Sequence, residues 1–299
     1  MKALGKFFRE RPLRGFAILF LFLVCSPAFA LPSLKGHVAL KNPILLIHGA
    51  TMGGANLKIG PFNFGDYFYG LADFLKASGT VAKTTALPTD ASIGQRAAVV
   101  GQILRSEFPG QKVNIIGHSL GGLDARYLAS VIKSDQIASI TTIGTPHFGS
   151  PSADWALRQM NSNGPWYWFF RLFGFDLRGR QFLPELTTDF MQKVFNEKVK
   201  DVPGVRYFSV RCAASFKNHT MSYLLWFPSH WMEGEKSPLL SGGHDGLVPL
   251  ESQTWGEVIA TLELDHLAEM NHHEFRQNEE DKSLEAYELI YNKLQAEGL

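Results

Sequence analysis

The hydrophobic positions of this chain follow two different periods in turn. Four short, mainly apolar segments are predicted to be strands of one sheet: 42–47, 81–87, 113–116 and 137–143. Three longer segments carry apolar residues at helical spacing: 67–77, 92–108 and 123–132. Because strands and helices alternate, the pattern predicts an α/β fold in which helices cover both faces of a mostly parallel sheet.

The alternation stops over residues 150–240, which we interpret as a cap or lid inserted into this fold. The segment is rich in aromatic residues, and five of them are consecutive from Trp166 to Phe170. No single helix or strand face can bury all five, so we expect part of this run to contact substrate or a lipid surface. The alternative is that these side chains only hold the cap onto the sheet. Residues 205–210 alternate like one more strand, and a closing helix is predicted over 284–296.

The N-terminus has the order of a secretory signal peptide. The first 14 positions contain five basic residues and one acid, and an apolar run follows over 16–24. Ala28-Phe29-Ala30 then has the small-x-small pattern of a cleavage site. This predicts a signal peptide over 1–30 and export of residues 31–299 to the periplasm or the medium. The alternative is an uncleaved anchor, although the apolar run is short for a membrane span.

Composition and charge exclude several classes of protein. The full chain of 299 residues is 45% hydrophobic and 19% charged, which suits one globular domain with a sizeable core. Removing 1–30 takes away five positive charges and one negative charge, so the formal net charge falls from +1 to −3, which gives no electrostatic basis for binding nucleic acid. Only Cys212 then remains, so no internal disulfide can form. Nothing in the sequence predicts an oligomeric state.

The candidate nucleophile is Ser119, in the run Gly117-His118-Ser119-Leu120-Gly121-Gly122. The run follows a predicted strand and precedes a predicted helix. A serine on a sharp strand-to-helix turn has its hydroxyl lifted into a cleft, and the flanking glycines are needed because a side chain there would collide with the strand or the helix. The context predicts the nucleophile elbow of an acyl-transfer enzyme. The alternative is a glycine-rich turn that serves helix packing alone.

A serine nucleophile needs a general base and an acid that orients the base. With the chain order serine, acid, histidine, the candidates are Asp245, in the glycine-rich loop 242–249, and His266, on a loop after a strand-like run. The alternatives are a turn aspartate bound to its own backbone and a surface histidine. The sequence also contains one rival acid and three rival bases: Asp265, His244, His272 and His273.

Two backbone N–H groups are needed to bind the oxyanion of a tetrahedral intermediate. Leu120, directly after the nucleophile, supplies the first. The second should come from the loop after the first strand, where Ala50 is the candidate and Thr51 the alternative.

These motifs resemble those of the bacterial secreted triacylglycerol lipases of the Pseudomonas and Burkholderia type, within the α/β-hydrolase superfamily. Seven segments between about residues 43 and 273 match in the family's order: 47–49, 113–119, 144–150, 186–188, 195–196, 244–248 and 265–267. The resemblance implies lipase or esterase activity with Ser119 as nucleophile, Asp245 as acid and His266 as base. It also implies Ala50 and Leu120 as oxyanion donors and a mobile amphipathic lid.

Two departures from that family concern its structural calcium and its disulfide. The family binds calcium through an aspartate two residues after the catalytic histidine and another in the cap. Here the first position is Ala268, and residues 221–236 show no equivalent aspartate pattern. Glu269 is a substitute ligand by position, but we do not expect the calcium site. A lone Cys212 cannot form the disulfide that these lipases often carry.

The sequence therefore favours a secreted serine hydrolase that cleaves carboxylic esters of lipids and needs no cofactor. An acyltransferase or a polyester depolymerase would use the same residues, because only the acceptor or the chain length differs. A peptidase is a further alternative, but the cap shows no charged pocket pattern. A silent binding protein on a hydrolase scaffold would have lost a member of the triad, and all three residues are present. The expected partners are a lipid or other ester substrate and, through the cap, a lipid surface.

Overall fold

The computed structural model describes residues 34–299 apart from 52, 60–61, 163, 165–167, 169–177, 236 and 274–279. The chain divides into two units, Met1–Leu31 and Pro32–Leu299, and every described residue lies in the second. The predicted signal peptide and most of the aromatic run 166–170 therefore lie outside the described residues. No helix among the described residues is both long enough and apolar enough to cross a membrane.

A six-stranded parallel sheet forms the centre of this unit, with the strand order β4-β1-β5-β6-β7-β8. Its strands have these bounds: β1 (Ile44–Ile47), β4 (Ala82–Thr84), β5 (Val113–His118), β6 (Ile137–Ile143), β7 (Arg206–Cys212) and β8 (Glu257–Leu262). Every residue of β1, β5 and β6 is buried, as expected for central strands that helices cover on both sides. The predicted α/β fold with a mostly parallel sheet is confirmed.

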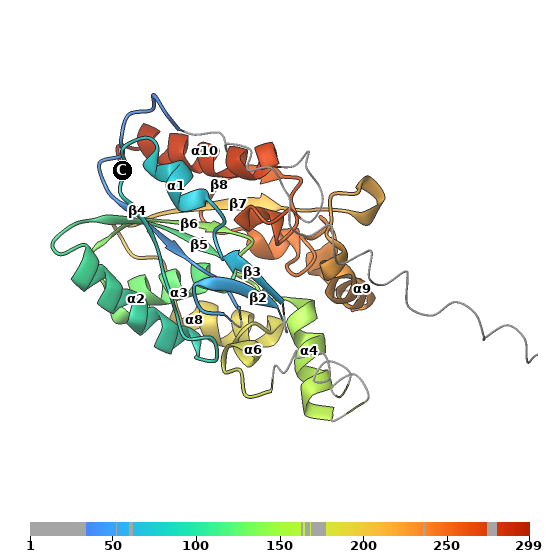
Figure 1. Cartoon of the computed structure of the whole chain (residues 1–299). Coiled ribbons are helices and arrows are strands. Elements are labelled where there is room, and N and C mark those ends of the chain that lie inside the picture. The colour runs from blue at the N-terminus through green and yellow to red at the C-terminus, as the bar shows by residue number, and fades with distance from the viewer. Residues whose placement is uncertain are drawn as a thin grey trace, which may run out of the picture. The chain divides into compact units, whose positions relative to one another are not determined.

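Helices cover both faces of the sheet (Figure 1). The α-helices have these bounds: α1 (Leu71–Lys76), α2 (Ile93–Glu107), α3 (Leu120–Tyr127), α4 (Pro151–Ser162), α6 (Phe182–Glu185), α7 (Thr188–Phe190), α8 (Asn196–Lys198), α9 (Trp226–Gly234) and α10 (Glu280–Ala296). Helices α1 and α10 pack together on one face, and α2 and α3 pack together on the other. The longest helix of the second face, α2, begins at Ser92 with a capping box that Gln95 completes, which explains its sharp start.

Shorter helical turns connect these elements. Two are π-helical, η1 (Leu128–Ile132) and η2 (Met191–Phe195). Five are 3-10 turns: η3 (Phe216–Asn218), η4 (Tyr223–Leu225), η5 (Pro238–Leu240), η6 (Leu250–Gln253) and η7 (Ala268–Met270). The helix predicted over 123–132 is thus two segments, α3 and η1, because the hydrogen-bond period widens at Leu128.

One feature of the fold was not predicted from the periodicity. Strands β2 (Asn56–Ile59) and β3 (Phe62–Asp66) form a separate antiparallel hairpin between β1 and α1. The strand-like run expected before His266 is strand β8, which lies at the edge of the sheet and has no fully buried residue.

Two helices from the segment interpreted as a cap, α4 and α9, pack against each other. The indole rings of Trp155 and Trp231 stack at 3.8 Å between centroids, and an ion pair joins Arg158 to Glu235 across the same two helices. Part of the aromatic content of this segment therefore stabilises its own packing. Trp168, the one described member of the run 166–170, is 59% exposed.

Candidate active site

Ser119 lies on the sharp turn between β5 and α3, as the sequence predicted. Its backbone has φ 54° and ψ −127°, an energetically unfavourable conformation for a residue with a side chain. The neighbouring glycines are required by space, because a Cβ on Gly117 would lie 2.6 Å from the Cα of Gly122 and one on Gly121 would lie 2.2 Å from the carbonyl oxygen of Ile47. The strained turn and its glycines together have the form of a nucleophile elbow.

Asp245 and His266 meet although 20 residues separate them in the chain. The Nδ1 atom of His266 lies 2.9 Å from Oδ2 of Asp245, and both residues are buried. A backbone hydrogen bond from His266 N to Asp245 O, at 2.8 Å, holds the two loops together. The other carboxylate oxygen accepts the N–H groups of Leu247 and Val248, and Gln253 donates to Oδ2. Asp245 is therefore held in one orientation by groups on its own loop and directed at the imidazole.

The rival acid, Asp265, is directed elsewhere. Its Oδ1 accepts the N–H groups of Leu267 and Ala268, directly before and at the start of η7, and its Oδ2 accepts the N–H of Ser222 at 2.5 Å. Asp265 thus fixes the loop that carries His266 without contacting the imidazole in any of these hydrogen bonds. The geometry favours Asp245 as the orienting acid.

The three rival histidines have structural partners. His244 accepts the N–H of Gly246 at Nδ1 and contacts Glu233 at Nε2. His272 contacts backbone carbonyl oxygens at the end of β3, and His273 contacts Ser283. Each of them joins two segments of the fold, which is the ordinary role of a half-buried or buried histidine.

The ring of His266 lies 4.6 Å, between centroids, from the ring of His118, the residue before Ser119. This contact places His266, the candidate base, beside the turn that carries Ser119. Leu120 is the first residue of α3, so its N–H is among the free donors at the helix N-terminus. Ala50 is exposed on the loop after β1, and Gly49 passes so close to Ser119 that a Cβ on it would lie 2.7 Å from the serine Cβ. The structure thus brings both predicted donor segments to Ser119.

Thr51, the alternative oxyanion donor, has another role for its side chain. Its hydroxyl donates to the carbonyl of Asn56 at 2.8 Å and accepts the N–H of Lys58 at 3.0 Å, both in β2. His48, before it, contacts Gly49 O through Nδ1 and accepts the N–H of Leu87 at Nε2. Burial, reinforced by the nearby Arg96, lowers the pKa of His48 to about 3, so this residue is a neutral link within the loop.

Arg96 on α2 forms hydrogen bonds to the loop that follows β1. This residue was not identified from the sequence. Its guanidinium contacts Asp124 on α3 and donates to the carbonyl oxygens of His48 and Pro88. Arg96 and Asp124 are both buried, and burial raises the pKa of Asp124 to about 6 despite the opposing effect of Arg96. The sequence did contain a signal for Arg96, because a charged residue on the buried face of a predicted helix requires a partner of opposite charge or hydrogen-bond acceptors.

Replacing Arg96 by lysine should weaken both the fold and the loop that bears Ala50. Lysine keeps the charge but cannot reach Asp124 and two carbonyl groups at once with a planar set of donors. We expect a loss of about 1–2 kcal/mol in the free energy of unfolding, measured by urea denaturation, and a lower kcat for ester hydrolysis. The conservative exchange Arg105→Lys, on the exposed side of the same helix, should change neither. Parental stability in the Arg96→Lys variant would contradict the support role.

A second unpredicted group is Glu269, three residues after His266 and completely buried. Its Oε2 lies 2.8 Å from Nε2 of His118 and 3.5 Å from Nδ1 of His266. On the far side of His118, Nδ1 lies 2.7 Å from the hydroxyl of Tyr67. Burial, and then the negative charge of Asp245, raise the pKa of Glu269 well above 4.5.

The proton positions in this network follow from the two pKa shifts. Burial lowers the pKa of His118 well below 6.5, so its imidazole is neutral and has one N–H. With a neutral carboxyl at Glu269, the O–H can donate to Nε2 of His118, and Nδ1–H can donate to Tyr67. His118 and Glu269 are 151 positions apart in the sequence, so no local pattern could predict that they would meet. The network makes His118 a positioning residue that fixes the end of β5 before Ser119.

The residues present do not fit the calcium site that the resemblance implied. Ala268 has no side-chain oxygen, and Glu269, the substitute by position, is turned inward to His118. Among the described residues, His118, His266 and Glu269 could converge on a metal ion, since one ligand atom from each lies within 4.8 Å of the others. The 2.8 Å distance between His118 and Glu269 is that of a hydrogen bond, which explains the cluster without an ion.

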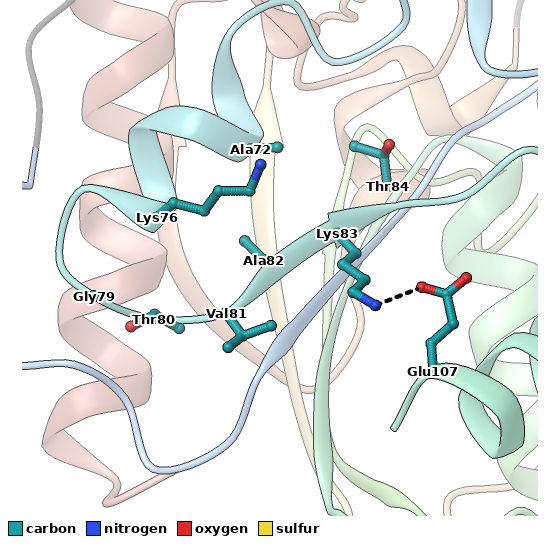
Figure 2. A pocket seen from close by; sticks show the side chains of 9 residues that line it. All are labelled: Ala72, Lys76, Gly79, Thr80, Val81, Ala82, Lys83, Thr84 and Glu107. Atoms are coloured by element: carbon teal, nitrogen blue, oxygen red, sulfur yellow. Dashed lines mark ion pairs between the residues drawn. The ribbon is translucent and has the colours of Figure 1, made fainter. Parts of the chain in front are cut away.

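An open hollow of about 670 Å³ lies elsewhere, along the outer edge of β4 (Figure 2). Lys76 and Lys83 line it, and Lys83 forms an ion pair with Glu107 across one side. Its other lining residues come from α1, β4 and the turn between them. Ser119, Asp245 and His266 do not line it, so we assign it no part in the site.

Comparison with known proteins places the chain in a family. The family model of the alpha/beta hydrolase fold matches residues 42–255. Triacylglycerol lipase 2 of Saccharomyces cerevisiae is 33% identical over 221 residues, which cover 69% of this chain and 62% of the yeast protein. A triacylglycerol lipase of Burkholderia plantarii is 38% identical over 150 residues, 48% of this chain and 39% of that protein. The matches thus span less than two thirds of the length of these relatives.

Solved structures agree on the fold. The structure of the Staphylococcus hyicus lipase superposes with a TM-score of 0.66 at 18% identity, covering 89% of this chain and 98% of that one. The mature form of the Bacillus licheniformis lipase BlEst2 gives 0.58 at 20% identity, covering 79% and 89%. The resemblance to triacylglycerol lipases noted in the sequence is confirmed. By its matched residues and its sheet, the chain belongs to the alpha/beta hydrolase fold family.

Proposed function

We propose that this protein is a secreted serine hydrolase that cleaves carboxylic esters of lipids through an acyl-enzyme. The observation that carries the proposal is the 2.9 Å contact between Asp245 and His266 beside the strained turn of Ser119. A buried carboxylate on Nδ1 leaves the opposite nitrogen of the imidazole available to a serine hydroxyl. The similarity to triacylglycerol lipases supports lipid esters as the substrate class.

The reaction begins when Oγ of Ser119 attacks the ester carbonyl carbon and His266 takes the hydroxyl proton. Asp245 stabilises the imidazolium that forms. The N–H groups of Ala50 and Leu120 bind the oxyanion of the tetrahedral intermediate. His266 then gives the proton to the departing alcohol, which leaves an acyl group on Ser119.

Water completes the cycle by the same route. His266 takes a proton from a water molecule as its oxygen attacks the acyl carbon. The second tetrahedral intermediate then collapses, the bond from the acyl carbon to Oγ of Ser119 breaks, and His266 returns the proton to Oγ, which frees the carboxylic acid. The N–H groups of Ala50 and Leu120 act in both halves, so their positions affect acylation and deacylation alike. Every proton in this scheme moves through His266, and the scheme needs no cofactor.

The segment 150–240 belongs to the proposal as a lid. Helix α9 contacts the loop of the acid, because the hydroxyl oxygen of Ser229 lies 2.6 Å from the carbonyl oxygen of Leu225 and 3.3 Å from that of Gly246. Exposed aromatic residues of this segment would contact a lipid surface while the site is open. Export through residues 1–30 would take the enzyme to the periplasm or the medium, where such lipids are available.

The test combines active-site labelling with an ester series. A serine-directed phosphonate should label Ser119, located by peptide mass spectrometry, and the Ser119→Ala protein should remain unlabelled. Hydrolysis of p-nitrophenyl esters should vanish in that variant, and activity on long acyl chains would separate a lipase from an esterase. A folded parental protein that neither reacts with the phosphonate nor hydrolyses any ester would overturn the proposal.

A further inference from the structure

The β2–β3 hairpin presents aromatic side chains to solvent. All five residues of β3 are exposed, and Phe62 and Phe64 are 55% and 36% exposed. Because side chains alternate along a strand, these two phenylalanines lie on one face of the hairpin. No charged residue occurs between Lys58 and Asp66. Residues 59–65 of the hairpin are thus uncharged and include two large apolar side chains that the fold does not bury.

Both ends of this hairpin are attached to the candidate active site. At its start, the hydroxyl of Thr51, next to Ala50, bonds to the backbone of Asn56 and Lys58. At its end, Tyr67 is buried with its hydroxyl 2.7 Å from His118, the residue before Ser119. The hairpin therefore projects from the oxyanion side of the site.

A second exposed apolar group borders the opposite side, where the acid and the base lie. Its members are on η4 and α9, and four of them, three aromatic and one aliphatic, are at least 38% exposed: Tyr223, Leu224, Trp226 and Phe227. Two contacts hold this group to the acid and base loops. The N–H of Ser222 donates to Asp265, beside His266, and a Cβ on Gly246, beside Asp245, would lie 2.8 Å from Leu225. In Figure 1, the hairpin and α9 lie toward the same end of the sheet.

We propose that the β2–β3 hairpin is a docking element for a lipid surface, with Phe62 and Phe64 as the inserting side chains. This inference rests on the proposed function, because an enzyme for water-insoluble esters must receive its substrate from a lipid aggregate. Exposed aromatic side chains on both sides of the candidate active site fit the interfacial region of such an aggregate, where aromatic rings bind well. The absence of charge over 59–65 removes the desolvation cost that a charged hairpin would have there.

Vesicle binding by the full-length Ser119→Ala protein tests this without hydrolysis of the lipid. Sedimentation with sucrose-loaded phosphatidylcholine vesicles gives the partition coefficient. We expect Phe62→Ser with Phe64→Ser to lower it at least tenfold, and Phe62→Trp with Phe64→Trp to raise it. The matched control is Val81→Ser with Val258→Ser, since these valines are 55% and 37% exposed, one directly before the edge strand β4 and the other on the edge strand β8. The control should bind like the parent.

A local measurement separates the hairpin from any binding by the N-terminal apolar run. Hydrogen exchange followed by mass spectrometry should show slower exchange over 56–66 when vesicles are added. Unchanged exchange there, or equal partition of the serine variants and the parent, would overturn the inference. In an active background, the serine variants should keep parental activity on a short, soluble ester. If the enzyme hydrolyses the soluble ester but the hairpin does not bind vesicles, only the docking proposal is refuted. The proposed function is refuted separately, if the phosphonate does not label Ser119.

Discussion

Replacing Asp245 by asparagine is expected to lower kcat for ester hydrolysis by about 10⁴-fold, an effect of the size seen when the acid of a serine triad is made neutral. The amide would present N–H groups to both His266 Nδ1 and Gln253, where the carboxylate now accepts. The imidazole would then be held in the wrong tautomer for accepting the proton of Ser119. Rates on a soluble p-nitrophenyl ester at pH 8 measure the loss.

The matched control for this variant is Asp265→Asn. Asp265 has the same side chain and the same burial, and it lies beside His266, but it accepts hydrogen bonds from the backbone N–H groups of Ser222, Leu267 and Ala268. We expect a loss of stability of about 1–2 kcal/mol and a change in kcat of less than tenfold. If the two variants exchanged these results, Asp265 would be the acid and the assignment of Asp245 would be wrong.

The second large effect concerns Glu269 and pH. A carboxyl group with a higher pKa in the folded protein than in the unfolded chain binds more protons when folded, so its contribution to stability falls as pH rises above the ordinary value of 4.5. The cost is about 1.4 kcal/mol for each pH unit between that value and the raised pKa. Glu269→Gln removes the ionisation and keeps an N–H donor for His118. We therefore expect its melting temperature to exceed that of the parent by an amount that grows from pH 5 to pH 8.

The chain offers a contrasting variant at the same position. Glu269→Leu fills the space but leaves Nε2 of His118 without a partner, so it should be about 2 kcal/mol less stable than Glu269→Gln, by the same amount at every pH. Glu269→Gln should retain most of the ester hydrolysis, because the proposed carboxyl is neutral already. A melting-temperature difference between Glu269→Gln and the parent that stays constant with pH would show that Glu269 is ionised in the folded protein.

Much of the fold could be predicted from local patterns because its central strands are buried on both faces. The strand over 137–143 was predicted with the bounds of β6, and α2 differs from its predicted range by one residue at each end. The β2–β3 hairpin was not predicted, because all five residues of β3 are exposed and form no continuous apolar run. Edge and hairpin strands form through pairing with their neighbours, which hydrophobic periodicity does not report.

The candidate site also combines features that local sequence predicts with features that only tertiary contacts decide. Its separate parts were predicted from sequence: the elbow at Ser119, the glycine-rich loop of Asp245, and the chain order that makes His266 the candidate base. The choice of Asp245 over Asp265 depended on where each carboxylate points, and the roles of Arg96, Tyr67 and Glu269 depended on contacts between distant segments. These side chains acquire their partners and their shifted pKa values through burial, which exists only after the chain has folded. Local sequence thus determined which groups are available and on which turns they lie, and tertiary packing decided which of them face each other and in what protonation state.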